Sequence, residues 1–579
     1  MENIDNPNIK QEEDGQQNVS GNMYSYRDNN NSQVIQEGGA IRRSIGEGNP
    51  DLNNIQNNFG SGYGQNYINN GNVDIQYSQN IYYNSNNKSF SWETYLIFGI
   101  IEALIIVLLA IFFEKKIIYK EDNILPRANS ENNSSNYGLL RDMNIMAFVG
   151  FGMLHTILRR NSWISISINI LLIAISVQLA LFFNYLWKIA FIEKFGDENF
   201  DLIYLMKAIF ISSSVLITSG CVIGKISMIQ YIILAIFETI LSSLNYQLCE
   251  TKLKVIDYGG ALYIHTFGAI FGIAVSTVLF CSTKIKQSFQ NYNYLNKSNY
   301  FSNITTFLGM IILFCYFPSF NSALAGKEKF SNIDMSTDLP YYMRMSKKFR
   351  QRGRYNTYFS LLGSVMGTFI TSGFFNNGRF VSEEIIFGCI SGAIIISGCS
   401  TVCLSFWGSI IIGTLGGIIS VIFISKIKPF LVKWGLKDTC NIILIHGING
   451  LLGSLITPII ITALRDDEEI KTYLTSRGKS PKKQSPIQIG AIFITIGISF
   501  IGGIATGYLM KVSLCGKITQ YFTDAEFFKE EENNIFDYVE PNTTFNIDIS
   551  NPSLFKQGFQ GYTNQKPMGP DLRGSQPSY

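Results

Sequence analysis

Three histidines are the residues of this sequence best suited to chemistry with protons and small polar molecules. They are His155, His265 and His446, and each lies in a largely apolar stretch. Ionisable side chains are costly inside a lipid bilayer and usually serve a function there. A neutral imidazole offers one N–H donor and one bare nitrogen acceptor. The histidines are therefore the first candidates for a functional site.

Two of the histidines share a spacing. Asp257 precedes His265 by eight residues, and Asp438 precedes His446 by eight residues. Both aspartates begin an apolar stretch. A helical rise of 1.5 Å per residue puts each histidine about 12 Å deeper, near the middle of a core about 30 Å thick. Aspartate is also a common helix N-cap, so capping and a role in shaping a site both remain open for this pair.

Twelve apolar stretches are long enough, or nearly so, to cross a bilayer. An even number of spans puts both chain ends on one side, and the spans that begin at Asp257 and Asp438 then run in opposite directions. Opposed elements with equal spacing are typical of an inverted repeat, which places its site near the midplane. A lone buried histidine is usually a core residue, but here we expect His265 and His446 to meet as neutral rings. The predicted spans are 93–113, 142–158, 163–187, 202–222, 228–249, 257–281, 301–325, 355–375, 381–402, 405–425, 438–464 and 487–510.

The composition agrees with an all-α membrane protein. The chain has 579 residues, 46% of them hydrophobic and 15% charged, whereas soluble proteins carry about 25% charged residues. The net charge of +3 is too small to suggest nucleic acid as a partner. The nine cysteines show no metal-ligand spacing. No nucleophile, metal cluster or phosphate loop indicates an enzyme or a cofactor.

Three domains are predicted. Residues 1–90 are polar and are predicted to be disordered and cytosolic, residues 91–515 hold the spans, and residues 516–579 form a cytosolic tail. Asn132 and Asn133 each begin a glycosylation sequon, which fits an outside loop. Most short basic loops then lie inside, as the positive-inside rule favours. Loop 326–353 breaks this rule because its basic residues fall outside.

Four segments resemble Rh glycoproteins, a branch of the Amt/Rh ammonium transporter family. Residues 257–268 (DYGGALYIHTFG) and 438–450 (DTCNIILIHGING) are similar to the family's motifs on the sixth and eleventh spans. Residues 317–323 (FPSFNSA) are similar to the end of the seventh span, and residues 141–152 (RDMNIMAFVGFG) to the start of the second. The resemblance covers roughly residues 92–540.

This resemblance implies an Amt/Rh-type fold of about twelve spans, assembled as a homotrimer with one pore in each protomer. It implies that His265 and His446 are the twin histidines of the pore and that Phe210 and Phe320 form a gate above them. It gives structural or vestibule positions to three polar residues. These are Asp257 on the outer side, Asp438 on the inner side, and Asn321.

Some residues depart from the family pattern. Tyr246 follows Asn245 where Rh proteins tend to have an acid, which implies a weaker attraction for cations. None of the five tryptophans falls near Asp257 or Phe320, which favours the Rh branch over the Amt branch. His155 stands where the family usually has an apolar residue. We expect it to be packed or solvated near the inner mouth rather than part of the pore.

The resulting prediction is a channel-like transporter of ammonium, an integral protein of the plasma membrane that conducts ammonia past the twin histidines. Methylammonium should pass too, and carbon dioxide is a further small neutral candidate. One alternative is a twelve-span sugar or drug carrier, but the loop 283–300 is short for that class. Another is a non-transporting scaffold or ammonium sensor, against which the two intact histidines argue.

Overall fold

The computed structural model describes most of residues 92–512 and four short stretches outside them, at 65–69, 72–76, 522–524 and 527–528. Asn132 and Asn133 lie outside the described residues, as does most of both tails. The chain divides into two compact units, of which Tyr83–Pro541 contains all the described helices. Within 92–512 the undescribed segments are 114–135, 193–200, 281–296, 326–338, 403–404, 437 and 477–479.

The other unit contains one described element, a β-hairpin. Strand β1 (Gln65–Asn69) pairs antiparallel with β2 (Asn72–Gln76), with Asn69 opposite Asn72. The sequence between the strands is Asn70-Gly71, a pair that favours two-residue hairpin connections. The hairpin lies within residues 1–90, for which disorder was predicted.

All regular elements described in the larger unit are helices, and helices occupy all twelve predicted span positions. Nine of the described helices are long and apolar enough to cross a membrane, judged by length and composition. Five short segments are π-helical, labelled η. The elements are α1 (Trp92–Phe113), η2 (Ile145–Gly150), α3 (Phe151–Leu154), α4 (Ser162–Ile192), α5 (Leu202–Val222), α6 (Met228–Gln247), η3 (Leu248–Leu253), η4 (Ala261–Thr266), α7 (Phe267–Phe280), α9 (Tyr300–Phe320), α10 (Leu339–Phe375), α11 (Ser382–Ile396), α12 (Phe406–Ile422), η6 (Phe423–Ile427), α13 (Lys428–Lys433), η7 (Ile443–Gly447), α14 (Ile448–Ala463), α15 (Glu468–Ser476) and α16 (Pro481–Leu509).

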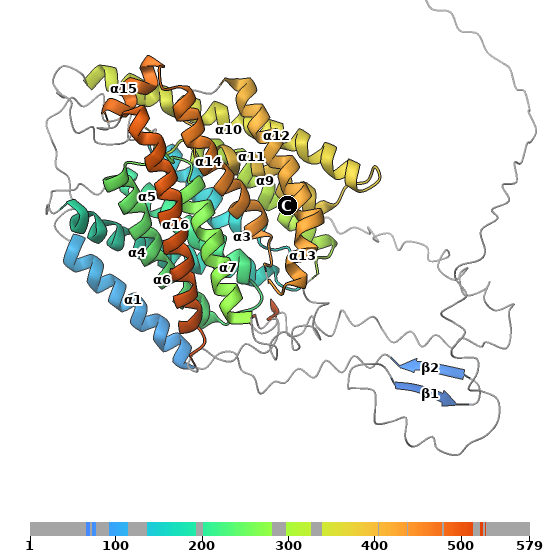
Figure 1. The fold of residues 1–579 in the computed structure, drawn as a ribbon. Helices are drawn as coiled ribbons and strands as arrows, with labels where there is room; N and C mark the ends of the chain where they lie inside the picture. The colour runs from blue at the N-terminus through green and yellow to red at the C-terminus, as the bar shows by residue number, and fades with distance from the viewer. Residues whose placement is uncertain are drawn as a thin grey trace, which may run out of the picture. The chain divides into compact units, whose positions relative to one another are not determined.

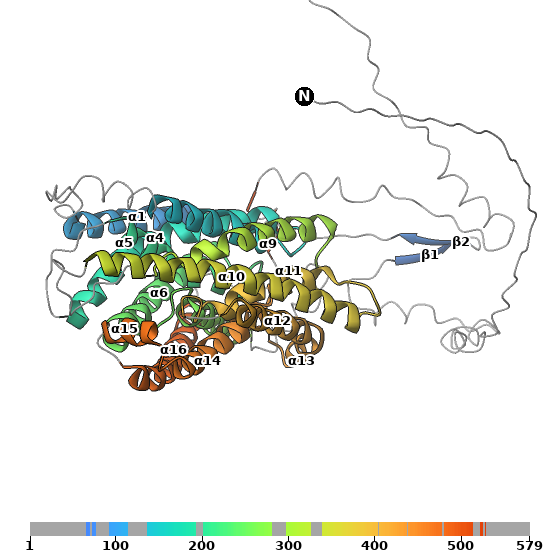
Figure 2. The ribbon, with the colours of Figure 1, turned by 90° about the horizontal axis from the view of Figure 1, so that it is seen from above.

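The long helices of this unit lie alongside one another, with α15 at one end of the bundle and α13 at the other (Figure 1). Seen after a 90° turn, α1, α4 and α5 lie on one side and α14 and α16 on the other (Figure 2). Helix α1 is peripheral, and apolar side chains such as Ile100 and Leu104 are more than half exposed. An apolar helix with so much exposed surface is suited to contact lipid.

Glycines allow α10 and α12 to pack backbone to backbone. A Cβ atom at Gly413 would lie 1.8 Å from the backbone oxygen of Ser360, and one at Gly363 would lie 2.2 Å from that of Ile410. No side chain fits at such distances. Small residues at crossing points are how membrane helices gain packing contacts without a hydrophobic driving force between them.

Helix α10 begins much earlier than the sequence predicted. Loop 326–353 was expected to precede a span starting at residue 355, but the helix starts at Leu339. Glu469 on α15 accepts hydrogen bonds from Lys348 (2.9 Å) and Arg352 (2.5 Å). Partial burial raises the pKa of the Glu469 carboxyl, whereas the hydrogen bonds and positive charges of Arg352 and Lys348 lower it. The second effect is larger, so the pKa of Glu469 lies below its usual value. This pairing neutralises part of the positive charge that made the loop an exception to the positive-inside rule.

The described part of the C-terminal segment is docked against the helical unit. Asp524 is buried, and its carboxylate accepts hydrogen bonds from the backbone N–H groups of Trp163 (3.2 Å) and Ile164 (2.8 Å). Backbone N–H groups in the first turn of a helix have no acceptor within that helix, and a side-chain oxygen commonly accepts their hydrogen bonds. A cytosolic tail was predicted for residues 516–579, and the described residues of this segment contact the start of α4.

Backbone contacts extend the docking to two neighbouring loops. The N–H of Phe522 donates to the oxygen of Gly224 (2.9 Å), and the N–H of Asp524 donates to that of Arg160 (2.8 Å). The Asn161 side chain donates to the oxygen of Phe522 (2.9 Å). Residues 522–524, the α3–α4 connection and the α5–α6 connection therefore lie on the same face of the helical unit.

Asp524→Ala should lower the stability of the folded protein. It removes the acceptor for two N–H groups at the start of α4, and loss of such a cap typically costs about 1 kcal/mol. Thermal unfolding in detergent checks this, with Asp524→Asn as the matched variant because it keeps one acceptor oxygen and should lose less. An unchanged unfolding midpoint in Asp524→Ala would show that the segment does not dock as described.

Candidate functional site

His265 and His446 meet in the interior of the helical unit. Their Nδ1 atoms are 3.1 Å apart, a hydrogen-bond distance. The ring centroids are 5.1 Å apart and the planes are inclined by 21°. Each residue is 1% exposed. The two rings, 181 positions apart in the sequence, therefore form one buried unit.

The Nδ1–Nδ1 contact restricts how protons are arranged on this pair. One Nδ1 must carry the hydrogen and the other must be bare, so the acceptor ring is neutral. If both rings are neutral, the donor ring has a bare Nε2 and the acceptor ring carries its hydrogen on Nε2. The pair then offers one acceptor and one donor to a small molecule beside it. His265 Nε2 is buried and has no partner among the described residues.

A π-helical turn positions His265. It lies in η4, which begins after Gly260, a glycine with a φ of +82° that other residues rarely adopt. Asp257 Oδ2 accepts hydrogen bonds from the N–H groups of Leu262 (2.8 Å) and Tyr263 (2.9 Å). Asp257 thus caps the turn that carries the histidine, one of the two possibilities left open for it.

The second half repeats this arrangement. His446 lies in π-helical η7, and Asp438 caps its start by accepting from the N–H groups of Ile442 (2.9 Å) and Ile443 (2.8 Å). Segment η4 packs against α14, while η7 packs against α7. Since each π-helical turn contacts the helix that continues the other, the two elements run antiparallel. The equal aspartate–histidine spacing thus has a structural basis in two opposed, similarly capped elements. π-helical turns often occur at functional sites.

Gly450 brings the two elements together. A Cβ atom at this position would lie 2.9 Å from Cβ of His265 and 2.8 Å from the oxygen of Ala261. A larger residue would push α14 away from η4 and widen the gap between the imidazoles. Sequence analysis quoted this glycine only as the end of a motif.

Phe210 and Phe320 lie against each other as a stacked pair. Their ring centroids are 5.5 Å apart, the planes are inclined by 18°, and both residues are buried. Phe317 links this pair to the histidines, with its ring 6.4 Å from that of Phe320 and 6.3 Å from that of His265. Phe317 was part of the quoted motif but was not singled out. A continuous series of aromatic rings therefore leads to the histidine pair.

The acid expected beside Asn245 is replaced by an aromatic ring. The Tyr246 ring lies 6.0 Å from that of Phe210 and 5.3 Å from that of Tyr263. The carboxylate of Glu250, one turn further on, forms an ion pair with Lys207 at 2.6 Å. Sequence analysis missed this pair. The Lys207 cation offsets the negative charge of Glu250, four residues after the position where Rh proteins tend to have an acid.

Asn321 ties the end of α9 to its neighbours. Its Nδ2 donates to the oxygen of Ala393 (2.9 Å) and to Thr357 Oγ1 (3.2 Å), and its backbone oxygen accepts from Ser400 (3.2 Å). The side chain is fully buried. These contacts hold the residue that follows Phe320, and they give Asn321 a positioning role.

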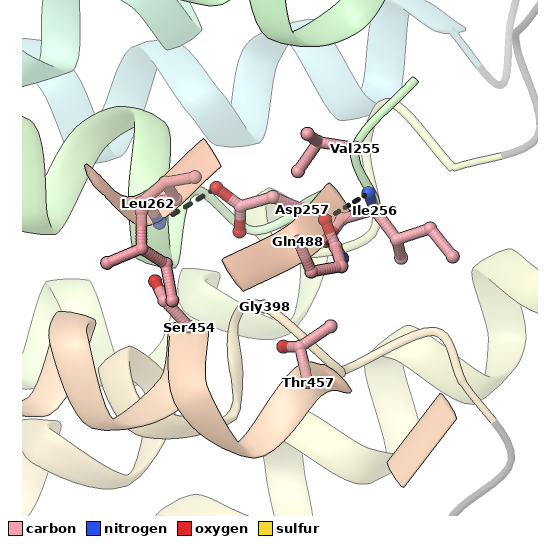
Figure 3. A pocket seen from close by; sticks show the side chains of 9 residues that line it. Val255, Ile256, Asp257, Leu262, Gly398, Ser454, Thr457 and Gln488 are labelled. Atoms are coloured by element: carbon pink, nitrogen blue, oxygen red, sulfur yellow. Dashed lines mark hydrogen bonds between the residues drawn. The ribbon is translucent and has the colours of Figure 1, made fainter. Parts of the chain in front are cut away.

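A small cavity adjoins Asp257 but does not include the histidines (Figure 3). It has about 10 Å³ of room for the centre of a water molecule, enough for about one. Gln488 closes one side, where its side chain exchanges hydrogen bonds with the backbone of Ile256. Asp257 Oδ1 is buried without a partner among the described residues. The cavity is lined by Val255, Ile256, Asp257, Leu262, Gly398, Ser454, Thr457, Gln488 and Ile492.

Glu238 is a buried acid that sequence analysis overlooked, although a lone glutamate inside an apolar stretch was a readable signal. Thr218 Oγ1 lies 2.7 Å from Glu238 Oε1 and 2.7 Å from the oxygen of Gly268. A hydroxyl donates one hydrogen, and the backbone oxygen can only accept. Both contacts are hydrogen bonds when Glu238 carries a proton. A protonated Glu238 thus connects α6, through α5, to the helix that follows His265.

No group of three or more His, Cys, Asp or Glu side chains that could hold a metal ion occurs among the described residues. The chemistry available at the centre of the unit is that of paired imidazoles beneath aromatic rings. Such an arrangement can exchange hydrogen bonds and protons with a small polar molecule.

Comparison with known proteins places these features in a family. Residues 102–522 match the model of the Ammonium Transporter Family. Ammonium transporter Rh type B of Danio rerio is 29% identical over 467 residues, covering 76% of this chain and 94% of that protein. Ammonium transporter Rh type C of Xenopus laevis is 30% identical over 449 residues, covering 74% and 89%. The solved structure of Nitrosomonas europaea Rh50 has 23% identity and a TM-score of 0.56, and it covers 75% of this chain and 100% of that one.

Proposed function

The chain belongs to the Rh branch of the ammonium transporter family, and we propose that it carries ammonium across a membrane by conducting neutral ammonia past His265 and His446. The observation that carries the proposal is the 3.1 Å contact between the two buried imidazoles. A pair of this kind can hold a small neutral molecule that both donates and accepts hydrogen bonds. Ammonia is such a molecule, and methylamine is only slightly larger.

The interior around the histidines favours a neutral solute over an ion. An unpaired charge near the centre of a bilayer costs several kcal/mol or more. The rings nearest the pair are apolar, with Phe317 beside His265 and Phe151 beside His446. We infer that ammonium gives up its proton before it passes the Phe210–Phe320 stack and regains one on the far side. Carbon dioxide is small and neutral, and the same route suits it.

The assembly, location and orientation of the protein are further parts of the proposal. The exposed apolar side chains of the helical unit support contact with lipid and with further copies of the chain, and we propose a homotrimer with one route in each protomer. We propose the plasma membrane as its location, with both termini in the cytosol. The docking of Asp524 beside the α3–α4 and α5–α6 connections supports a shared side for these loops and the C-terminal segment.

Proteoliposomes test the function directly. When an inward ammonium gradient is imposed, ammonia that enters takes up protons, so the internal pH should rise faster than in empty liposomes. The matched variant is Thr277→Ala, an exposed position on the helix that follows His265, and it should behave as the unchanged protein does. A scaffold or sensor that does not transport would leave the pH trace at the level of empty liposomes, and that result would refute the proposal.

A further inference from the structure

The third histidine was expected to be packed or solvated near the inner mouth, and solvation is wrong. His155 is the residue at the C-terminal end of α3, and none of its surface is exposed. Neither of its ring nitrogens has a hydrogen-bond partner among the described residues. Its backbone is satisfied, since the N–H donates to the oxygen of Phe151 and the oxygen accepts from Ser165. The imidazole is the unsatisfied part.

The ring lies close to the histidine pair. Phe151, one turn before His155, has its ring 6.2 Å from that of His155 and 6.4 Å from that of His446. A single aromatic ring thus touches both imidazoles. His155 is therefore a neighbour of the central site rather than a residue of a remote surface.

Gly220 shows on which side of His446 the ring lies. A Cβ atom at Gly220 would be 2.7 Å from the side chain of Ile442 and 2.8 Å from His155 Nε2. Ile442 is one turn before His446, on the side of Asp438, which caps it. Phe151 lies beside His446. His155, one turn after Phe151, and Ile442, one turn before His446, both lie beside Gly220. The two pairs lie side by side, so His155 is one turn nearer to Asp438 than His446 is.

The missing side chain at Gly220 also bears on what His155 does. The space that a side chain would occupy there is taken by Ile442 and by the nitrogen-bearing edge of the imidazole. Buried polar atoms in native proteins nearly always have a hydrogen-bonding partner in the protein, in water or in a ligand. An apolar residue would fill the same place without two unpaired nitrogens. The ring is thus better suited to binding a small polar solute than to packing alone.

We propose that His155 is a third imidazole station on the conduction route, binding ammonia after it leaves His446 on the side of Asp438. This inference rests on the proposed function and extends it. The neutral ring offers one donor and one acceptor, the same capacity as each member of the pair. A solute leaving the pair therefore meets another hydrogen-bonding group one turn further on, instead of a purely apolar passage.

Flux measurements and NMR together test the station. His155→Leu replaces the imidazole with an apolar side chain of similar bulk and should slow ammonia conduction about threefold to tenfold, the effect of one lost hydrogen bond. His155→Gln keeps a donor and an acceptor and should retain most of the flux. Met153→Leu, half-buried on the same helix, is the matched control and should conduct as the unchanged protein does. Assembly is checked by gel filtration of each variant.

Because the chain has only three histidines, NMR can detect ammonia binding at each of them without a transport measurement. In protein labelled with ¹⁵N-histidine in lipid bilayers, His155→Leu identifies the signals of His155. Replacing sodium chloride with ammonium chloride at about pH 8.5 should shift the signals of all three histidines, because part of the added ammonium is then ammonia.

The outcomes separate this inference from the proposed function. If the unchanged protein conducts while His155→Leu conducts equally well, the station is refuted and the function stands. If flux falls in His155→Leu but the His155 signals do not move with ammonium, the ring only packs, and the binding role is refuted. If the unchanged protein does not conduct at all, the proposed function fails and the station fails with it.

Discussion

His265→Ala and His446→Ala are each expected to slow ammonia conduction in proteoliposomes about 10- to 100-fold, while each variant elutes in gel filtration as the unchanged protein does. Each change removes one ring of the pair and with it one of the two Nε2 atoms that the proposed function assigns to binding the solute. It also leaves the Nδ1 of the other ring without its 3.1 Å partner. An unpaired buried polar atom costs about 1–3 kcal/mol, and about 1.4 kcal/mol corresponds to tenfold. Initial rates of internal pH change, normalised to reconstituted protein, give the comparison.

The double variant sharpens this expectation. If the two rings act as one hydrogen-bonded unit, the second substitution removes little that the first has left, and the double variant should be only slightly slower than either single variant. Independent residues would instead multiply their effects. Flux equal to that of the unchanged protein in either single variant would contradict the role assigned to the pair.

The helical periodicity and the apolar stretches were enough to predict much of this architecture. The equal eight-residue spacing of the two aspartate–histidine pairs indicated two matching elements, although the helical turn begins at Ala261 rather than at Asp257, as the depth expectation had assumed. The opposed direction of the two elements followed from counting spans between them. Neither step needed side-chain detail, and this explains why the general arrangement of the helical unit could be predicted from the sequence.

The π-helical turns could not be predicted in the same way. A π-helical turn is set by hydrogen bonds between residues five apart, and the residues of η4 and η7 are ordinary helix residues in an apolar segment. The caps at Asp257 and Asp438 are local contacts, whereas the close approach of Gly450 to His265 is tertiary and leaves no local pattern in the sequence. Sequence spacing located the histidines but did not specify how their rings would face each other.

Two other differences have similar causes. The early start of α10 was missed because hydropathy detects only the part of a helix that lies in lipid, while its basic first turns depend on Glu469 of α15. The docking of Asp524 depends on free N–H groups at the start of α4, more than 350 residues earlier. Long-range pairing of this kind leaves no periodic pattern in the sequence.

The most direct test of the account compares ammonium with potassium in the same proteoliposomes. The two ions are similar in size, but potassium has no proton to lose and so cannot become neutral before it meets His265 and His446. A potassium gradient, measured as protein-dependent potassium entry, should produce no flux above that of empty liposomes, while an ammonium gradient should raise the internal pH faster than in empty liposomes. Potassium permeation comparable to that of ammonium would mean that dehydrated cations pass the histidine pair, and it would contradict conduction of neutral ammonia.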